Sequence, residues 1–174
     1  FKANEIKRLG TTIDDAPGGV FDKVAKMLNL PKFSGSEVEK YAQKGNENRF
    51  SFPLPLINTN DCDLSFSGLK SSVRRQVDYL IEKQSGLYES DQMDVCASFQ
   101  KSMRIIFEKK TKKAVDLFSK LSSGEKISFS LAGGVAANKN IRNSLKSLCH
   151  NLDVIFSAPP LDLCTDNGLM IAYA

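Results

Sequence analysis

The strongest constraint on the fold lies near the C-terminal end, where a short apolar run leads through two glycines into an amphipathic helix. The run ISFSLA spans residues 127–132, Gly133 and Gly134 follow it, and helical spacing of apolar residues begins near Ala137. A second short apolar run, DVIFS, spans 153–157. Strand, glycine turn, helix and strand is typical of a βαβ unit with parallel, buried strands. The sequence therefore predicts an α/β fold with a parallel sheet.

The first 126 residues have a different, mainly helical character. Apolar residues recur there at helical spacing, with proline and glycine between the periodic segments. Residues 46–63 lack this spacing and are expected to form a loop. We expect a glycine turn at Gly18 and Gly19 feeding a helix from Val20, a short helix ending near Gly45, a helix capped by Ser67 that runs to about Lys83, and a long helix from about Asp91.

Composition excludes several classes of protein. The chain has 174 residues, of which 41% are hydrophobic and 25% charged, as in a globular domain rather than a disordered tail or a collagen-like fibre. No apolar run approaches the roughly 20 residues that span a bilayer. A net charge of +4 permits a nucleic-acid partner without requiring one. His150 is the only histidine, which excludes a site needing two histidines from this chain alone, and the four cysteines form no CxxC pair and are expected to be buried hydrophobes.

The glycine turn before the last complete helix is a candidate nucleotide site. Gly133 and Gly134 let a ligand approach the backbone, and the helix N-terminus that follows offers free N–H groups to a phosphate. Asn138 lies in the first turn, where its amide is placed to bind a sugar or a base. A tight strand-to-helix connection without any ligand explains the same residues, and the pattern alone leaves both interpretations open.

Aspartates mark two further candidate sites. Asp166 follows an apolar stretch and precedes a helix, a position suited to a metal ligand but equally to a helix N-cap. Asp14, Asp15 and Asp22 surround the first glycine turn, where a carboxylate can bind ribose hydroxyls or cap the helix. Capping is the simpler explanation in both places.

Two basic features have plain structural explanations as well. Lys70, in the string SFSGLK, is placed to meet an anion, although a helix start explains the string equally well. The run Lys109 to Lys113 is a candidate contact for RNA phosphates, but such runs are more often a solvated helix face.

Five strings taken together resemble one family. IDDAPGGVFDKVAKML, FPLPL, SFSGLK, LAGGVAANKNIR and LCTDNGLMIAYA occur in this order over essentially the whole chain. They are similar to the TsaD family, also called OSGEP or Gcp, of tRNA N6-adenosine threonylcarbamoyltransferases. The resemblance implies an actin/sugar-kinase-like (ASKHA, RNase H-like) fold of two lobes, of which this chain is an incomplete part. Residues 1–126 would then be a linking turn and a mainly helical insertion, and 127–174 part of the C-terminal α/β nucleotide-binding lobe.

The resemblance also implies an activity and a set of site residues. The family transfers threonylcarbamoyl from threonylcarbamoyl-AMP to N6 of the adenosine next to the anticodon, in tRNAs that read codons starting with A. By motif, Gly18, Asp22 and Asn138 correspond to substrate-binding residues, and Gly133 and Gly134 to the nucleotide loop. Asp166 corresponds to a ligand of one divalent metal ion, iron or zinc. No residue is assigned a catalytic role.

The chain departs from the family pattern at several points, and these departures support an alternative function. The HxxxH helix and the Ser-Gly-Gly-His loop of the first lobe are absent from this chain, so the other metal ligands must lie outside it and the chain alone is expected to be inactive. Many members have Gly-Glu where this chain has Gly18-Gly19, and an aspartate where it has Glu5. The rival hypothesis is a non-catalytic, actin-like module that binds nucleotide or tRNA. A metalloprotease is disfavoured because the chain has no HExxH motif.

Partners and location follow from the same resemblance. The expected partners are tRNA, threonylcarbamoyl-AMP from a separate synthase, and either a second copy, as in mitochondrial members, or helper subunits, as in bacterial ones, with no membrane association. The strings DDAPG and DCDLSF are similar to those of animal mitochondrial members, which predicts a mitochondrial location, with a bacterial cytoplasm as the alternative. Because the chain begins at Phe1 and stops at Ala174 in an apolar stretch, both ends are expected to be cuts in a longer protein.

Overall fold

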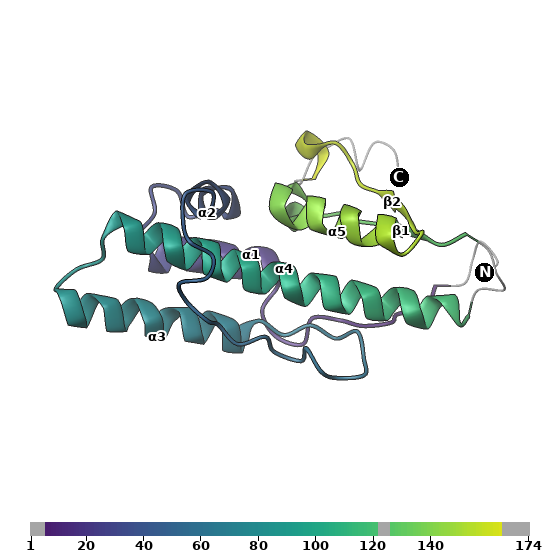
Figure 1. The fold of residues 1–174 in the computed structure, drawn as a ribbon, viewed down its shortest axis with the longest axis horizontal. Coiled ribbons are helices and arrows are strands. Elements are labelled where there is room, and N and C mark those ends of the chain that lie inside the picture. The colour runs from purple at the N-terminus through teal and green to yellow at the C-terminus, as the bar shows by residue number, and fades with distance from the viewer. Residues whose placement is uncertain (1–5, 122–125, 165–174) are drawn as a thin grey trace.

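A computed structural model, which describes residues 6–121 and 126–164, places a group of helices beside a small parallel sheet (Figure 1). The α/β class predicted from the sequence is therefore confirmed for the described residues. The elements in chain order are α1 (Pro17–Met27), α2 (Gly35–Ala42), α3 (Ser67–Gln84), α4 (Glu89–Ser119), β1 (Ser128–Ser130), the 3-10 helix η1 (Gly134–Ala137), α5 (Lys139–Asn151), β2 (Ile155–Ser157) and the 3-10 helix η2 (Leu161–Leu163). The last helix expected from the sequence, near Asn167, lies outside the described residues.

Helix α4 is the scaffold of the molecule. Its 31 residues give a length of about 46 Å, and α2 and α5 both pack against it (Figure 1). Val95, Phe99, Met103 and Ile106 recur every three or four residues along one face and are fully buried. These residues share one hydrophobic core with side chains of α1, α2, α3 and α5. The long helix predicted from this spacing is confirmed.

The first glycine turn is part of a helix, not a turn before it. Pro17 occupies the first position of α1, where its missing N–H removes no helical hydrogen bond. Gly18 and Gly19 complete the first turn, and the N-cap residue Ala16 has no side chain able to cap. The expectation that the helix begins only at Val20 is therefore wrong, because a proline at the first position lets α1 begin earlier.

The N-terminus of α3 is capped from a distant part of the chain. The expected cap, Ser67, is the first residue of the helix, and Phe66 precedes it without a side-chain cap. Asp14 supplies the missing acceptor by accepting hydrogen bonds from the N–H of Phe66 at 2.8 Å and from the hydroxyl of Ser67 at 2.7 Å. A parallel β-bridge between Thr12 and Leu64 joins the same two segments. The prediction that Ser67 caps α3 is wrong, because the carboxylate of Asp14 accepts the hydrogen bonds at the start of this helix.

The two strands form a parallel pair, as predicted, but they are not buried. Phe129 lies opposite Phe156 in the register, and both rings pack toward the helices. The side chains on the opposite face are exposed, including Ile155 at 48%. Helix α5 packs against β2. The expectation of buried strands is wrong for the described part of the chain, because only one face of this sheet packs against helices there.

The four cysteines are buried and free, as their scattered positions in the sequence predict. Cys62, Cys96, Cys149 and Cys164 are all buried and unpaired in disulfides, which confirms their prediction as small core residues. Burial raises the pKa of Cys96 to about 12, so this thiol stays protonated.

None of the helices in the described ranges has the length and apolar character of a membrane span.

A close approach between two backbones makes Gly45 a sensitive position. A Cβ atom on Gly45 would lie 2.1 Å from the carbonyl oxygen of Met93 in α4, and this oxygen belongs to rigid helical backbone. We therefore expect Gly45→Ala to lower the free energy of unfolding by about 3 kcal/mol, measured by chemical denaturation of the intact protein. Gly86→Ala is the matched control, because a Cβ there meets nothing within 4 Å. A Gly45→Ala variant as stable as Gly86→Ala would contradict the packing described.

Candidate functional site

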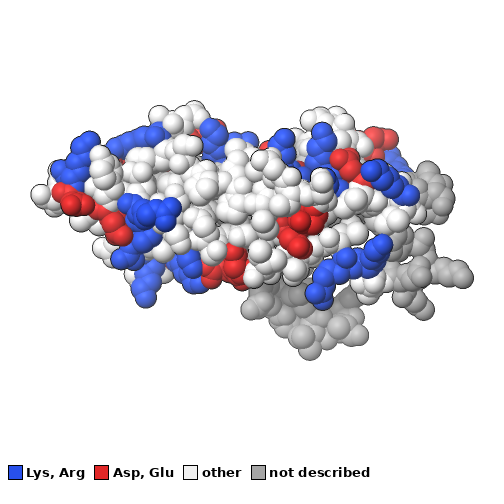
Figure 2. Space-filling model, turned by 90° about the horizontal axis from the view of Figure 1, so that it is seen from below, with Lys and Arg blue, Asp and Glu red and all other residues white. Residues whose placement is uncertain are grey.

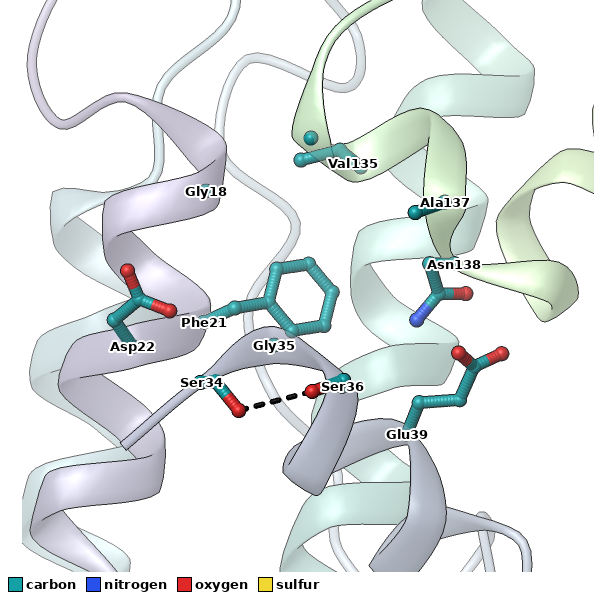
Figure 3. A pocket seen from close by; sticks show the side chains of 11 residues that line it. Gly18, Phe21, Asp22, Ser34, Gly35, Ser36, Glu39, Val135, Ala137 and Asn138 are labelled. Atoms are coloured by element: carbon teal, nitrogen blue, oxygen red, sulfur yellow. Dashed lines mark hydrogen bonds between the residues drawn. The ribbon is translucent and has the colours of Figure 1, made fainter. Parts of the chain in front are cut away.

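One pocket of about 310 Å³ gathers the first turns of three helices (Figure 3). The N-terminal turn of α1 forms one side, the start of α2 the floor, and η1 with the start of α5 the opposite side. Its lining residues are Gly18, Phe21, Asp22, Ser34, Gly35, Ser36, Glu39, Gly134, Val135, Ala137 and Asn138. The pocket thus combines a mostly apolar surface with a few polar side chains, as small-molecule sites do.

Four residues singled out in the sequence meet in this pocket. Gly18 and Asp22 come from α1, while Gly134 and Asn138 come from the strand-to-helix connection more than a hundred residues later. Gly133 does not line the pocket. Its φ of +86° instead permits the sharp turn before η1, a backbone conformation that favours glycine. The structure therefore places Gly133 in a conformational role and the other four residues around one cavity.

Asn138 is buried and its amide is engaged on both sides. Its Oδ1 accepts a hydrogen bond from the N–H of Ile141 at 3.0 Å, which makes it the N-cap of α5. Its Nδ2 donates to Oε1 of Gln100, on α4, at 2.8 Å. Both side chains are at most 8% exposed. Asn138 is thus held in place, with an oxygen lone pair and one amide hydrogen left over for a ligand.

Helix α5 begins at Lys139, two residues after the expected start at Ala137, because the single turn η1 precedes it. Its first N–H groups are not free to bind phosphate. Oε1 of Glu39, in α2, accepts from the N–H of Lys139 at 2.7 Å and from that of Asn140 at 3.4 Å. The N–H groups that the sequence offers to a phosphate are therefore occupied in the described structure by a carboxylate of the chain itself.

Glu39 and Gln100 were missed by the sequence reasoning. Each lies within a regular amphipathic helix, where a polar residue looks like ordinary surface. Glu39 is 100 residues from Lys139, and Gln100 is 38 residues from Asn138. Only the position of Gln100 within the apolar stripe of α4 offered a signal, because a polar side chain there must find a buried partner.

The aspartates before α1 hold the fold together and do not line the pocket. Burial works against ionisation of Asp14, but hydrogen bonds from Ser65, Phe66 and Ser67 hold its pKa well below the usual range. Hydrogen bonds from Lys23 and Lys70 likewise lower the pKa of Asp15. Lys70 is thus engaged by Asp15. The aspartates do not cap α1, the helix after the glycine turn, as expected, because Asp14 binds the start of α3 instead.

The basic run of α4 is partly committed to a neighbouring loop. Lys110 is 6% exposed and donates to the hydroxyl of Thr59 at 2.8 Å and to Asp61 at 3.1 Å. Lys113 donates to Asn60 at 3.0 Å. On the face shown in Figure 2, Lys and Arg side chains are scattered among acidic ones and do not form one basic patch. The run therefore anchors the 58–61 loop.

The metal ligand expected at Asp166 lies outside the described residues. In the ranges 6–121 and 126–164, no three His, Cys, Asp or Glu side chains come together in a group able to hold a metal ion. Asp22, in the pocket, has no such partners among the described side chains. The part of the chain that the structure describes therefore contains no complete donor set for a metal ion.

Comparison with known proteins gives a consistent result over the whole chain. The family model described as "TsaD: tRNA N6-adenosine threonylcarbamoyltransferase" matches residues 1–173. A Ruegeria pomeroyi protein named tRNA N6-adenosine threonylcarbamoyltransferase is 47% identical over 170 residues, covering 98% of this chain and 46% of the relative. A Paracoccus denitrificans protein with the same name is also 47% identical, over 98% of this chain and 46% of its own length. The chain therefore spans about half the length of the curated relatives it matches.

These relatives correct the expected location. They come from bacteria, including a second Ruegeria strain at 48% identity over 169 residues, which is 97% of this chain and 46% of that relative. Bacteria have no mitochondria, so similarity to bacterial proteins points away from a mitochondrial enzyme. The mitochondrial prediction, which rested on the short strings DDAPG and DCDLSF, is wrong by this comparison.

Proposed function

Since the chain belongs to the tRNA N6-adenosine threonylcarbamoyltransferase (TsaD) family, we propose that the intact protein transfers threonylcarbamoyl from threonylcarbamoyl-AMP to N6 of the adenosine next to the anticodon. The tRNAs concerned are those that read codons starting with A. In this reaction the N6 amine attacks the carbamoyl carbonyl, the bond from that carbonyl to the phosphate oxygen breaks, and AMP leaves as N6 loses a proton.

The observation that supports this proposal most is the meeting of Gly18, Asp22 and Asn138 around one pocket. Phe21 and Val135 supply apolar surface on which an adenine ring can pack. Asp22 is exposed to solvent at the rim, where a carboxylate can accept hydrogen bonds from ribose hydroxyls. The pocket therefore suits the adenylate half of the donor, which must be held while its carbonyl is attacked.

The division of the chain is part of the proposal. We assign residues 1–126 to a linking turn and a mainly helical insertion, and 127–174 to part of the C-terminal α/β lobe of a two-lobed, actin-like enzyme. The β1–β2 sheet supports this assignment, because the described helices cover only one of its faces, and α/β lobes commonly carry a further layer on the second face. The donor would come from a separate synthase, and a second copy or helper subunits would complete the assembly.

Asp166 is proposed as one ligand of a single divalent metal ion, iron or zinc, whose other ligands lie outside this chain. Such a metal, when bound, polarises a carbonyl or holds a phosphate oxygen. Elemental analysis of the intact, purified protein measures this directly. A protein that transfers threonylcarbamoyl with no stoichiometric iron or zinc would overturn the assignment.

The function is tested by incubating the intact protein with tRNA, threonine, bicarbonate, ATP and a threonylcarbamoyl-AMP synthase, and by measuring the modified nucleoside by mass spectrometry. We expect transfer, and we expect Asp22→Ala to raise the Kd for AMP about tenfold, as for the loss of a hydrogen-bonded charge. Asp162→Ala, in η2, is the control because Asp162 does not line the pocket. AMP binding without transfer would favour the rival, a non-catalytic module that binds nucleotide or tRNA.

A further inference from the structure

Glu39 forms the partition between two neighbouring hollows. The pocket of about 310 Å³ described above lies on one side of it. A second hollow of about 270 Å³ lies on the other, lined by residues that include Gln43, Gln100 and Asn140. Glu39 lines both hollows, and its carboxylate faces Asn138 across the end of the pocket (Figure 3). Its side chain therefore determines which polar groups a ligand meets at the end of the pocket nearest α5.

The Glu39 carboxylate lies where an anion would bind. It accepts from the first two N–H groups of α5, at 2.7 and 3.4 Å, and Asn138 caps the third. Helix N-termini attract phosphate because such N–H groups are free and carry partial positive charge. Here all three N–H groups have an acceptor, and the negative charge of Glu39 repels a second anion.

The wall beside Glu39 is fixed by an independent contact. Gln100 and Asn138 are joined by a buried hydrogen bond of 2.8 Å between α4 and the start of α5. Glu39 joins α2 to the same turn of α5. Two different helices therefore hold this turn, and its first N–H groups point toward the Glu39 carboxylate.

We propose that Glu39 is a specificity-determining residue of the pocket. Its carboxylate closes the N-terminus of α5 to phosphate, so that the uncharged nucleoside part of the ligand lies beside Asn138 and the phosphate lies away from it. The inference rests on the proposed function only for the choice of an adenine nucleoside as ligand. It does not depend on transfer to tRNA.

The test uses isothermal titration calorimetry on the intact protein, with adenosine as ligand and orthophosphate as competitor. Glu39→Ala opens the helix N-terminus, whereas Glu39→Gln keeps an oxygen acceptor for the N–H of Lys139. Glu108→Gln is the matched control, because Glu108 also binds α5, through the hydroxyl of Ser144, but does not line the pocket. Thermal unfolding of each variant shows whether it remains folded.

We expect wild-type protein and Glu108→Gln to bind adenosine with no competition from millimolar orthophosphate. Glu39→Ala should bind adenosine about tenfold more weakly and should lose it further to orthophosphate, whereas Glu39→Gln should stay within about threefold of wild type. Competition by orthophosphate in wild type equal to that in Glu39→Ala would overturn the proposal, as would no adenosine binding to wild type. Failure of tRNA modification with these binding results intact would instead overturn the proposed function alone.

Discussion

Phe99→Ala is expected to lower the free energy of unfolding by about 4 kcal/mol, the largest effect of any substitution considered for this chain. Phe99 lies in the middle of α4 and is fully buried. Its ring meets that of Phe21 edge to face, with ring centroids 5.0 Å apart. Removing the ring loses both the buried apolar area and this contact, and it leaves a cavity that rigid helices cannot close.

The same substitution should also disturb the pocket, because Phe21 forms part of its lining. Chemical denaturation of the intact protein measures the loss of stability, and calorimetry with AMP measures the loss of binding. Phe99→Leu keeps most of the volume and is expected to cost about 1.5 kcal/mol. Tyr79→Ala is the surface control, since Tyr79 is 53% exposed. A Phe99→Ala variant within 1 kcal/mol of the Tyr79→Ala control, on the scale of about 4 kcal/mol expected for a buried ring, would show that α4 is not the centre of the core.

Most helices can be predicted from the spacing of apolar residues, because this spacing depends on residues that are close together in the sequence. The spacing of Val95, Phe99 and Met103 predicts α4 because residues four apart lie on one face of a helix. The parallel pairing of β1 and β2 follows equally from the order strand, glycine turn, helix, strand. Burial of those strands does not follow, since exposure of Ile155 depends on what covers the sheet and not on the strand's own residues.

The groups that cap the helix N-termini were predicted least well, because a capping side chain can come from a distant part of the sequence. Ser67 has the right chemistry for a cap, yet Asp14, more than fifty residues earlier, takes the role. The free N-terminus expected for α5 is likewise filled by Glu39. In both cases a carboxylate from another helix or turn, more than fifty residues away in the sequence, accepts hydrogen bonds from N–H groups at the start of the helix. Motif resemblance identified Gly18, Asp22 and Asn138 as one set, while their meeting in one pocket required the structure.

Asp14→Ala is expected to cost about 2 kcal/mol at neutral pH, as for the loss of a strong helix cap. Asp14 accepts hydrogen bonds from Phe66 and from Ser67, and it also binds the hydroxyl of Ser65 at 2.5 Å. It therefore joins the segment before α1 to the start of α3. Asp78→Ala is the control, because Asp78 pairs with Arg74 on the surface with 57% of its side chain exposed, and such pairs contribute little.

The pH dependence of this effect distinguishes a charged cap from simple packing. Burial opposes ionisation of Asp14, but the hydrogen bonds lower its folded-state pKa below the unfolded value of 3.8. The ionised carboxylate therefore stabilises the fold at any pH above the unfolded pKa, and this contribution is lost as the pH falls toward the folded pKa. Denaturation at a series of pH values should show wild type and Asp14→Ala converging below about pH 4. A stability difference that is the same at neutral and acidic pH would mean that the charge of Asp14 contributes nothing, and that the two segments are joined by packing and the Thr12–Leu64 bridge alone.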